Sequence, residues 1–513
     1  MPLLIMPRSI MPRSIMPLLM TVILSFLLVA CDAQQGNPRG LAAPQINAAE
    51  NNPGGESSVS YKPFASFQLP AANIANGLRP DFHAGKALAN QPWVKAPTIT
   101  FARDGLGPIY NARTCLTCHI KGGKGFIPAD NKTPLTSTLV RLSILPEFST
   151  LDAIEKTKKL KVSGNIPHSV YGDQIQSQSI SLAHQLRHSQ KPGVLKHDVA
   201  PEAYIHINWQ EKVFTYPDQS QVSLRYPDLD FKYLGYGDIN DGAVFSIRVA
   251  PMIHGMGLIS LISDEDILAL SDDNDSNQDG ISGRPNQVWN VETKRTELGR
   301  FGLKANKPTL EMIVAGAFTN DLGITNSLEP HQPCTKLQPT CLNMPDGNDE
   351  EGVELPDHLL TLVVNFNRNL APVKRREPNN PAVLTGRDLF YQSGCHQCHN
   401  PSFTTQKSSE FPHLSQQIIW PYSDFLLHDM GTDLADGRAD FLATGNEWRT
   451  PPLWGIGLLS QVNGMSTLLH DGRARSVEEA ILWHGGEAEL AKNRFVVLEK
   501  QDRERLIKFV NSL

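Results

Sequence analysis

Most hydrophobic positions of this 513-residue chain recur at a helical period. Five segments follow the pattern most clearly: 308–318, 356–370, 381–391, 476–484 and 502–513. Pro308 and Pro356 stand in the first turns of their segments, and Ser476 forms a capping box with Glu479. Between 204 and 226, apolar and polar residues alternate instead, which predicts β-strands. We therefore expect a mainly α fold with a β-containing insertion.

An internal repeat relates the two halves of the chain. Residues 251–258 read Pro-Met-Ile-His-Gly-Met-Gly-Leu and match 451–458, Pro-Pro-Leu-Trp-Gly-Ile-Gly-Leu, at a register of 200. An arginine shortly precedes each copy, Arg248 in the first and Arg449 in the second. The sequence thus predicts two related halves.

The amino terminus combines charge and apolarity in the order typical of exported proteins. Arg8 and Arg13 precede an apolar run from 20 to 30, too short for an ordinary membrane span. The run ends in Leu-Val-Ala-Cys, which reads as a lipobox and predicts lipidation of Cys31. Asp32 resembles the signal that keeps enterobacterial lipoproteins in the inner membrane. We expect a lipid-anchored protein on the periplasmic side of a bacterial membrane, with the inner membrane favoured.

Composition excludes one class of partner. The chain has 47 basic and 53 acidic residues and a net charge of −6, so it has no basic field for nucleic acid. From 32 to about 59 it is rich in Gln, Asn, Pro, Gly and Ala, which suits a flexible tether. The remaining length is sufficient for two or three domains.

Two segments have the spacing Cys-x-x-Cys-His: Cys115, Cys118 and His119 in the first half, and Cys395, Cys398 and His399 in the second. This spacing is the covalent attachment site of c-type haem, in which the thiols become thioethers and the histidine becomes the proximal iron ligand. A zinc ribbon or a redox dithiol is less favoured, because both copies end in histidine and the chain has an export signal. The sequence predicts two covalently bound haem c groups.

Two of the seven cysteines are left after lipidation and haem attachment. Cys334 and Cys341 enclose a short loop, and a disulfide between them suits an oxidising compartment. A catalytic thiol pair is the alternative.

These features give a domain plan. We expect a signal peptide at 1–30, a tether and N-terminal extension at 31–90, and a first haem domain at 91–345 with an insertion at about 130–245. A connecting helix at 346–380 leads to a second haem domain at 381–513. Both haem domains are expected to be cytochrome-c-like.

Further motifs carry a family resemblance, at 107–115, 300–302, 315–318, 321–325, 428–431, 449–455, 469–474 and 483–487. The chain resembles the di-haem oxidoreductases, a family also labelled thiol oxidoreductases. That family is distantly similar to bacterial di-haem cytochrome c peroxidases and to the di-haem enzyme that matures tryptophan tryptophylquinone. The resemblance implies peroxidase-like chemistry at one of the haems.

The peroxidases indicate an axial ligand for the second haem. Their electron-transfer haem takes a methionine fourteen residues beyond a conserved histidine, and the same count from His470 reaches His484. We predict that His399 and His484 ligate this iron together, which lowers its potential relative to His/Met ligation. Met430 and Met465 are the rival ligands, and His484 alternatively only complements the negative end of its helix.

The first haem is expected to be open on its distal side. The position that matches His484 falls near Ala317, which cannot bind iron. An open haem can bind peroxide, and cleavage of the O–O bond needs a group that moves a proton. Asp321 is the first candidate for this catalytic role and Glu202 the second. His168, His197, His206 and His254 are alternatives that would close the site.

A possible calcium site lies between the halves of the repeat. Asp275, Asn277 and Asp279 put oxygen ligands at alternate positions before a glycine, as calcium loops do. The twelfth position of the loop holds Asn286 instead of glutamate. An ordinary Asp/Asn/Gly turn is an equal alternative.

We therefore expect a periplasmic di-haem oxidoreductase. An electron-donor protein or a quinol-linked donor would reduce the second haem, and electrons would pass to the first haem, where a small oxidant such as hydrogen peroxide is reduced. One alternative enzyme oxidises thiols or protein side chains. A non-enzymatic alternative is a membrane-tethered electron carrier or an iron-handling partner.

Overall fold

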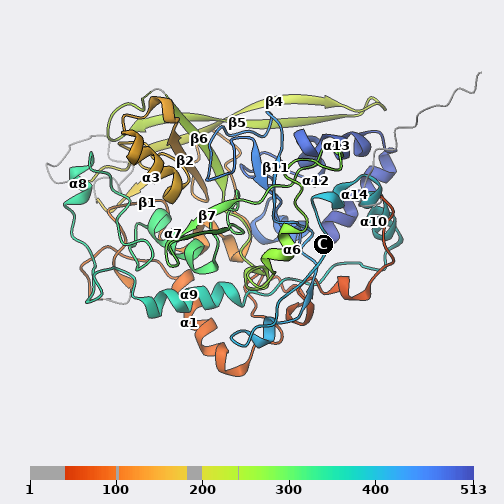
Figure 1. Ribbon diagram of the computed structural model, residues 1–513, viewed down its shortest axis with the longest axis horizontal. Coiled ribbons are helices and arrows are strands. Elements are labelled where there is room, and N and C mark those ends of the chain that lie inside the picture. The colour runs from red at the N-terminus through yellow and green to blue at the C-terminus, as the bar shows by residue number, and fades with distance from the viewer. Residues whose placement is uncertain (1–40, 100–102, 182–198, 241) are drawn as a thin grey trace, which may run out of the picture. The chain divides into compact units, whose positions relative to one another are not determined.

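The computed structural model describes residues 41–99, 103–181, 199–240 and 242–513 (Figure 1). The predicted signal peptide, the lipidation site Cys31 and Asp32 lie outside these ranges. By their contacts, residues 37–513 belong to one unit. No described helix is both long and apolar enough to cross a membrane.

The helices are short or of medium length. The longer ones are α1 (Arg79–Asn90), α3 (Ala153–Ser163), α7 (Leu310–Leu322), α9 (Asp357–Arg368), α10 (Pro381–Gln392), α12 (Val477–Leu482), α13 (Glu489–Val496) and α14 (Lys500–Ser512). The shorter ones are α2 (Cys115–Cys118), α5 (Met256–Ile259), α6 (Asp264–Leu268), α8 (Pro339–Leu342) and α11 (Leu459–Asn463). Helices therefore occur in all five segments whose periodicity predicts them.

In the described ranges, strands form six antiparallel pairs. The long pairs are β4 (Ala203–Thr215) with β5 (Gln221–Leu234) and β2 (Thr138–Ile144) with β6 (Ala243–Val249). The short ones are β1 (Ile109–Tyr110) with β3 (Gln178–Ser179), β7 (Gln287–Asn290) with β8 (Arg295–Leu298), β9 (Phe403–Thr404) with β10 (Ile418–Ile419), and β11 (Leu427–Asp429) with β12 (Glu447–Arg449).

The prediction of a mainly α fold built from cytochrome-c-like domains was wrong. The structure is 31% helical and 19% strand, with several small sheets. The alternation at 204–226 marks only part of the β4–β5 hairpin, and the short pairs lack a run long enough to recognise. Such two-stranded pieces are stable only when they pack against other elements, so the surrounding structure determines them.

The two halves share one kind of helix crossing. Helix α1 packs on α9 at Gly85, and α10 packs on α14 at Gly386. A Cβ atom at Gly85 would collide with the Leu362 carbonyl, and one at Gly386 with the Arg505 carbonyl. The backbones at both crossings thus approach as closely as only glycine permits.

The repeated segments contact each other. A Cβ atom at Gly255 would meet the Trp454 ring, and one at Gly455 would meet the ring of His254 at 3.1 Å. Both glycines have a φ of +78°, which L side chains rarely adopt. The internal repeat therefore forms a reciprocal contact between the halves.

The β4–β5 hairpin of the first half reaches the helices of the second (Figure 1). The Tyr216 hydroxyl donates a hydrogen bond to Glu478 on α12 at 2.9 Å, and Arg503 on α14 pairs with Asp218 at 2.7 Å. The hairpin thus connects the insertion to the second half.

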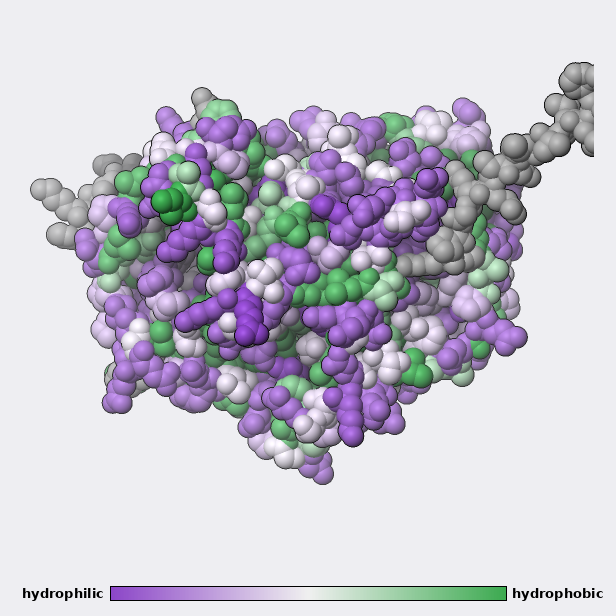
Figure 2. Space-filling model, in the orientation of Figure 1, coloured by the Kyte–Doolittle hydropathy of each residue, from purple (hydrophilic) through white to green (hydrophobic). Residues whose placement is uncertain are grey.

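The face of the molecule in Figure 2 is mostly hydrophilic, with hydrophobic residues in scattered groups.

Candidate functional site

Both Cys-x-x-Cys-His segments open into one interior cavity of about 670 Å³. The first segment forms α2 and the second a single helical turn, Cys395–Gln397, that follows α10. All six residues of the two motifs, Cys115, Cys118, His119, Cys395, Cys398 and His399, line the cavity. A volume of this size lies within the range of small-molecule and cofactor pockets.

The two motif histidines are held in the same way. His119 Nδ1 lies 2.6 Å from the Pro251 carbonyl, and His399 Nδ1 lies 2.9 Å from the Tyr422 carbonyl. Because a carbonyl only accepts, each Nδ1 carries the proton and Nε2 keeps its lone pair. Burial lowers the pKa of both rings, that of His399 to about 4. Both are therefore neutral imidazoles suited to bind iron.

The first cysteine of each motif lies in a poorly solvated environment. Burial raises the pKa of Cys115 and of Cys395 to about 12, and the charge of Asp321 adds to the effect at Cys115. A thiol with such a pKa stays protonated at neutral pH, whereas metal-binding cysteines are thiolates. Each motif offers the two thiols and the one imidazole that attachment of a porphyrin uses.

His484 lies on the wall of the same cavity, directly after α12. Its Nδ1 is 2.6 Å from the Ala480 carbonyl, so Nε2 keeps its lone pair. Burial is the main cause of the lowered pKa of His399, and the hydrogen bond to the Tyr422 carbonyl opposes it. The nearby His484 lowers this pKa further. Met430 also lines the cavity, whereas Met465 is 39% exposed and is not among the lining residues.

The first half contributes helix α7 to the wall, where Ala317 and Asp321 line the cavity. Gln174 donates a hydrogen bond from Nε2 to the Asp321 carboxylate at 2.9 Å. Burial raises the pKa of Asp321, while Arg141 and Gln174 act against this. A carboxyl group with a raised pKa is suited to proton transfer near neutral pH.

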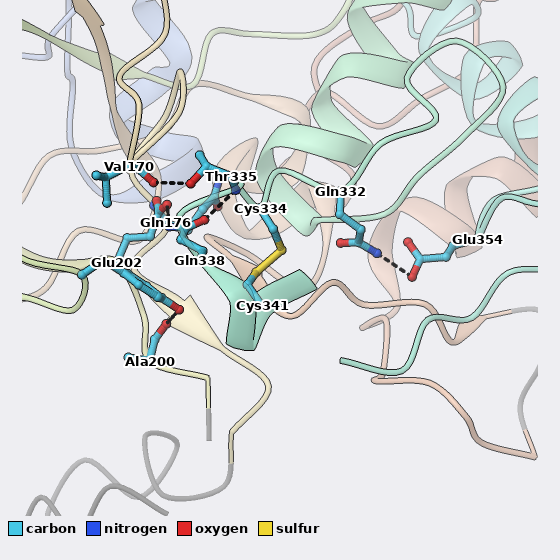
Figure 3. The surroundings of a disulfide bond; sticks show 11 residues. Val170, Gln176, Ala200, Glu202, Gln332, Cys334, Thr335, Gln338, Cys341 and Glu354 are labelled. Carbon is cyan, nitrogen blue, oxygen red and sulfur yellow. Dashed lines mark hydrogen bonds between the residues drawn. A yellow bond between two sulfur atoms is a disulfide. The ribbon is translucent and has the colours of Figure 1, made fainter. Parts of the chain in front are cut away.

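Glu202 is buried but is not among the residues that line the cavity. Its carboxylate accepts hydrogen bonds from the Gln176 backbone N–H at 2.7 Å and from Gln338 Nε2 at 2.6 Å (Figure 3). Burial raises its pKa to about 8. Gln338 belongs to the loop that the disulfide between Cys334 and Cys341 closes.

Of the other histidines proposed for the first haem, His254 lines the cavity. Its Nε2 lies 3.2 Å from the Trp454 carbonyl, and its ring stacks on Phe67 at 4.5 Å. His168 accepts hydrogen bonds from two backbone N–H groups, and His206 contacts the Asn131 carbonyl. Neither lines the cavity, and His197 lies outside the described residues.

The acidic loop binds mainly its own backbone. Asp275 accepts from the Gly280 N–H, Asn277 from that of Asp279, and Asp279 from that of Ile281. Over the described part of the chain, no group of three or more His, Cys, Asp or Glu side chains has an arrangement that could hold a metal ion. Calcium binding therefore stays a prediction.

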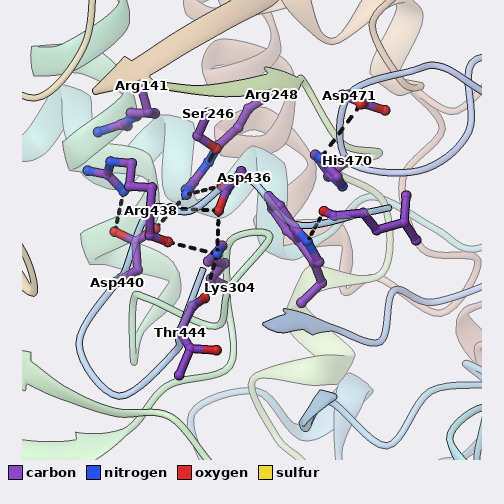
Figure 4. A network of polar contacts seen from close by, with 12 residues as sticks. Arg141, Ser246, Arg248, Lys304, Asp436, Arg438, Asp440, Thr444, His470 and Asp471 are labelled. Carbon is purple, nitrogen blue, oxygen red and sulfur yellow. Dashed lines mark hydrogen bonds and ion pairs between the residues drawn. The ribbon is translucent and has the colours of Figure 1, made fainter. Parts of the chain in front are cut away.

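A buried ionic network beside the cavity is not apparent in the sequence (Figure 4). Lys304 pairs with Asp436 at 2.9 Å, and Arg248 and Arg438 both pair with Asp440. Asp436, Arg438 and Asp440 are close in the chain, but Arg248 and Lys304 come from distant segments, so no local motif indicates the network. Only Arg248 has a sequence signal, because it precedes the repeat.

Two rings that sequence analysis did not pair lie against this network. The indole of Trp448 and the imidazole of His470 stack at 3.7 Å with their planes 7° apart. Both rings line the cavity. They come from separate motifs of the second half, and only folding brings them together.

Another buried histidine also lines the cavity. His428 lies between two carboxylates, with Nδ1 2.6 Å from Glu487 and Nε2 2.8 Å from Asp424. Its Nδ1 is 3.6 Å from the sulfur of Cys398. In the sequence, His428 is visible only as part of the family resemblance.

One cavity is thus lined by both Cys-x-x-Cys-His segments and by further imidazoles, an arrangement that suits haem binding. The chain matches the family model described as "Di-haem oxidoreductase, putative peroxidase" over residues 48–513. It therefore belongs to this family of di-haem oxidoreductases, which implies two haem groups. Searches of curated proteins and of solved structures found no match.

Proposed function

We propose that this protein is a periplasmic, peroxidase-like oxidoreductase with two covalently attached haem c groups. Cys115 and Cys118 would hold the first, and Cys395 and Cys398 the second. The position of all four cysteines on the cavity wall and the shared hydrogen bonding of the two motif histidines support this assignment. Haem supplies a redox-active iron that can exchange electrons and bind a small oxidant.

The observation that carries the proposal is the asymmetry of the cavity wall. In the second half, His484 lines the cavity and bonds the Ala480 carbonyl through Nδ1, whereas the matching position of the first half is Ala317, which offers only a methyl group. His254 of the first half also lines the cavity, but its Nε2 is engaged by the Trp454 carbonyl. An iron with two protein ligands suits electron transfer, and an iron with one open position suits chemistry. We infer that electrons enter at the second haem and are used at the first.

Asp321 is the proton-transfer group in this proposal. Reduction of hydrogen peroxide to water takes up electrons and protons in equal number, so a proton must reach the leaving oxygen. The place of Asp321 on the cavity wall and its raised pKa support this role. Glu202 is the weaker candidate, because its carboxylate bonds to Gln176 and Gln338 away from the cavity.

The electron source is proposed from the compartment. A lipid on Cys31 would keep the protein at the membrane, inner membrane favoured, near a quinol-linked donor or a small electron-donor protein. No nucleic-acid partner is proposed, since the net charge is −6.

An electron paramagnetic resonance spectrum of the haem-loaded protein tests the function. We expect a high-spin ferric signal from the first haem, either as isolated or after addition of one electron per protein, and its loss on adding peroxide. The second haem should give a low-spin signal that peroxide does not change. Low-spin signals alone in both states, unaffected by peroxide, would make the protein an electron carrier and overturn the proposal.

A further inference from the structure

The cationic side chains of the cavity wall fall into two groups. The lining residues include Lys124, Arg141, Arg248, Arg300, Lys307, Arg449 and Lys492. Five of them have a carboxylate within 4.0 Å: Arg141 has Asp173, Arg248 has Asp440, Arg300 has Asp264, Lys307 has Glu329, and Lys492 has Glu489. Within the described ranges, Lys124 and Arg449 form no such ion pair.

Lys124 and Arg449 bind carbonyl oxygens instead. Lys124 Nζ donates to the Leu469 carbonyl at 2.5 Å. Arg449 Nε donates to the Gly302 carbonyl at 2.8 Å, and one terminal nitrogen donates to the carbonyl of Thr450 at 3.2 Å. Carbonyl groups orient these cations but do not neutralise them.

The two contacts are reciprocal between the halves of the chain. Lys124 follows the first attachment motif and binds a carbonyl of the second half. Arg449 precedes the second copy of the repeat and binds a carbonyl of the first half. Both cations thus lie where the halves meet, on the wall of the cavity that the two motifs share.

Lys124 and Arg449 are partly buried, and a cation removed from bulk water without an anion is unfavourable. Burial lowers the pKa of Lys124 to about 8, although the charge of Asp471 opposes it. It lowers the pKa of Arg449 to about 10, against the charge of Asp424. The wall is therefore short of negative charge at two places, and an anionic ligand would restore the balance.

We propose that Lys124 and Arg449 bind the propionate carboxylates of the two haems. This inference rests on the proposed haem attachment. The propionates are the anionic groups of haem, and no other part of it can neutralise two wall cations. Arginine offers a planar pair of N–H donors that matches a carboxylate, and lysine a compact charge.

A positive charge beside a haem stabilises the reduced state more than the oxidised state. Loss of Lys124 or Arg449 should therefore favour the ferric form and lower the reduction potential of the haem whose propionate it binds. For a partly screened charge at close range, we expect the ferric-to-ferrous ratio at the wild-type midpoint to rise about tenfold.

The test compares Lys124→Met and Arg449→Met with the wild-type holoprotein. Spectroelectrochemistry measures the potential of each haem, and resonance Raman spectroscopy measures the propionate bending modes, which report hydrogen bonding to the carboxylate. We expect each variant to lower one potential and to shift the bending mode of a propionate. The double variant Lys307→Met/Glu329→Gln removes a paired cation with its anion and should change neither.

Three results would overturn the inference: unchanged potentials, a shifted potential with unmoved propionate modes, or the same changes in the double variant. If the methionine variants do not accumulate haem, Lys124→Arg and Arg449→Lys decide. If these charge-conserving variants bind haem with near-wild-type potentials, the positive charge is what the two positions require. If they fail to bind haem as the methionine variants do, the charge is not the requirement and the inference is overturned. If the variants show these shifts but the wild-type holoprotein does not turn over peroxide, only the peroxidase proposal is refuted.

Discussion

Asp321 and Glu202, the first and second candidates from the sequence, show how environment separates two carboxyl groups. Glu202 is buried and Asp321 is partly buried, and desolvation raises the pKa of each. Asp321 lies on α7 at the cavity wall, however, whereas Glu202 bonds to the disulfide-closed loop. A proton carrier must reach the reacting oxygen, so geometry decides in favour of Asp321.

Substitution of Asp321 tests this at the residue scale. Asp321→Asn keeps the shape and the contact with Gln174 but cannot exchange a proton, so kcat/KM for peroxide should fall by about 100-fold or more. If Asp321 acts as a base, wild-type activity should decline as the pH falls through its raised pKa, and the variant should lack this limb. Steady-state kinetics across pH measures both.

The matched control is Glu202→Gln, an isosteric change of a buried carboxyl away from the cavity, which should retain turnover. Equal loss in both variants, or full activity in Asp321→Asn, would remove the proton-transfer role from Asp321.

At the scale of elements, helix α12 determines where His484 lies. Ser476 accepts the Glu479 N–H at 3.1 Å at its start, and Glu479 binds Arg475 in return at 2.9 Å. The β4–β5 hairpin holds the same helix through Tyr216. A local cap and a distant contact together hold the helix that delivers the imidazole to the cavity.

Replacement of this imidazole tests its role as a ligand. His484→Met should keep a low-spin spectrum and raise the potential of the second haem markedly, because a thioether stabilises ferric iron less than an imidazole does. Potentiometric titration followed by visible spectroscopy measures the change.

Met465→Leu is the control, because Met465 is partly exposed and does not line the cavity. An unchanged potential in His484→Met, or a shift in Met465→Leu, would contradict the assignment.

At the scale of the whole molecule, the ionic network joins the two halves. Lys304 and Arg248 come from the first half, and Asp436 and Asp440 from the second. Burial alone would raise the pKa of Asp440, but Arg438 and Arg248 hold it well below its usual value. This carboxylate therefore stabilises the fold above the pKa of an unfolded aspartate, and the contribution is lost as the pH falls.

Removal of one partner should be costly. Lys304→Met leaves Asp436 buried beside fewer cations, and we expect the free energy of unfolding to fall by about 3–5 kcal/mol. Lys212→Met, which breaks an exposed pair with Asp433, should cost about 1 kcal/mol or less. Chemical denaturation of both holoproteins measures the difference, and similar losses would show that the network does not stabilise the contact between the halves.

Local signals predicted part of this molecule well. Pro308, Pro356 and Pro381 mark the starts of α7, α9 and α10 to within a few residues, because capping and first-turn preferences act between near neighbours. The extent of the strands and the mixed α/β character were missed. Those elements depend on pairing and packing across the chain, for which a single sequence contains no direct signal.

The sequence by itself determined the attachment motifs, the internal repeat and the membership of the di-haem oxidoreductase family, because each depends on residue identity at short spacing. Only the tertiary structure decided that both motifs share one cavity, that Asp321 reaches its wall while Glu202 does not, and that Lys124 and Arg449 bind carbonyl oxygens there and form no ion pair with a described carboxylate. Burial, orientation and charge balance arise when distant segments pack together, so they are properties of the fold.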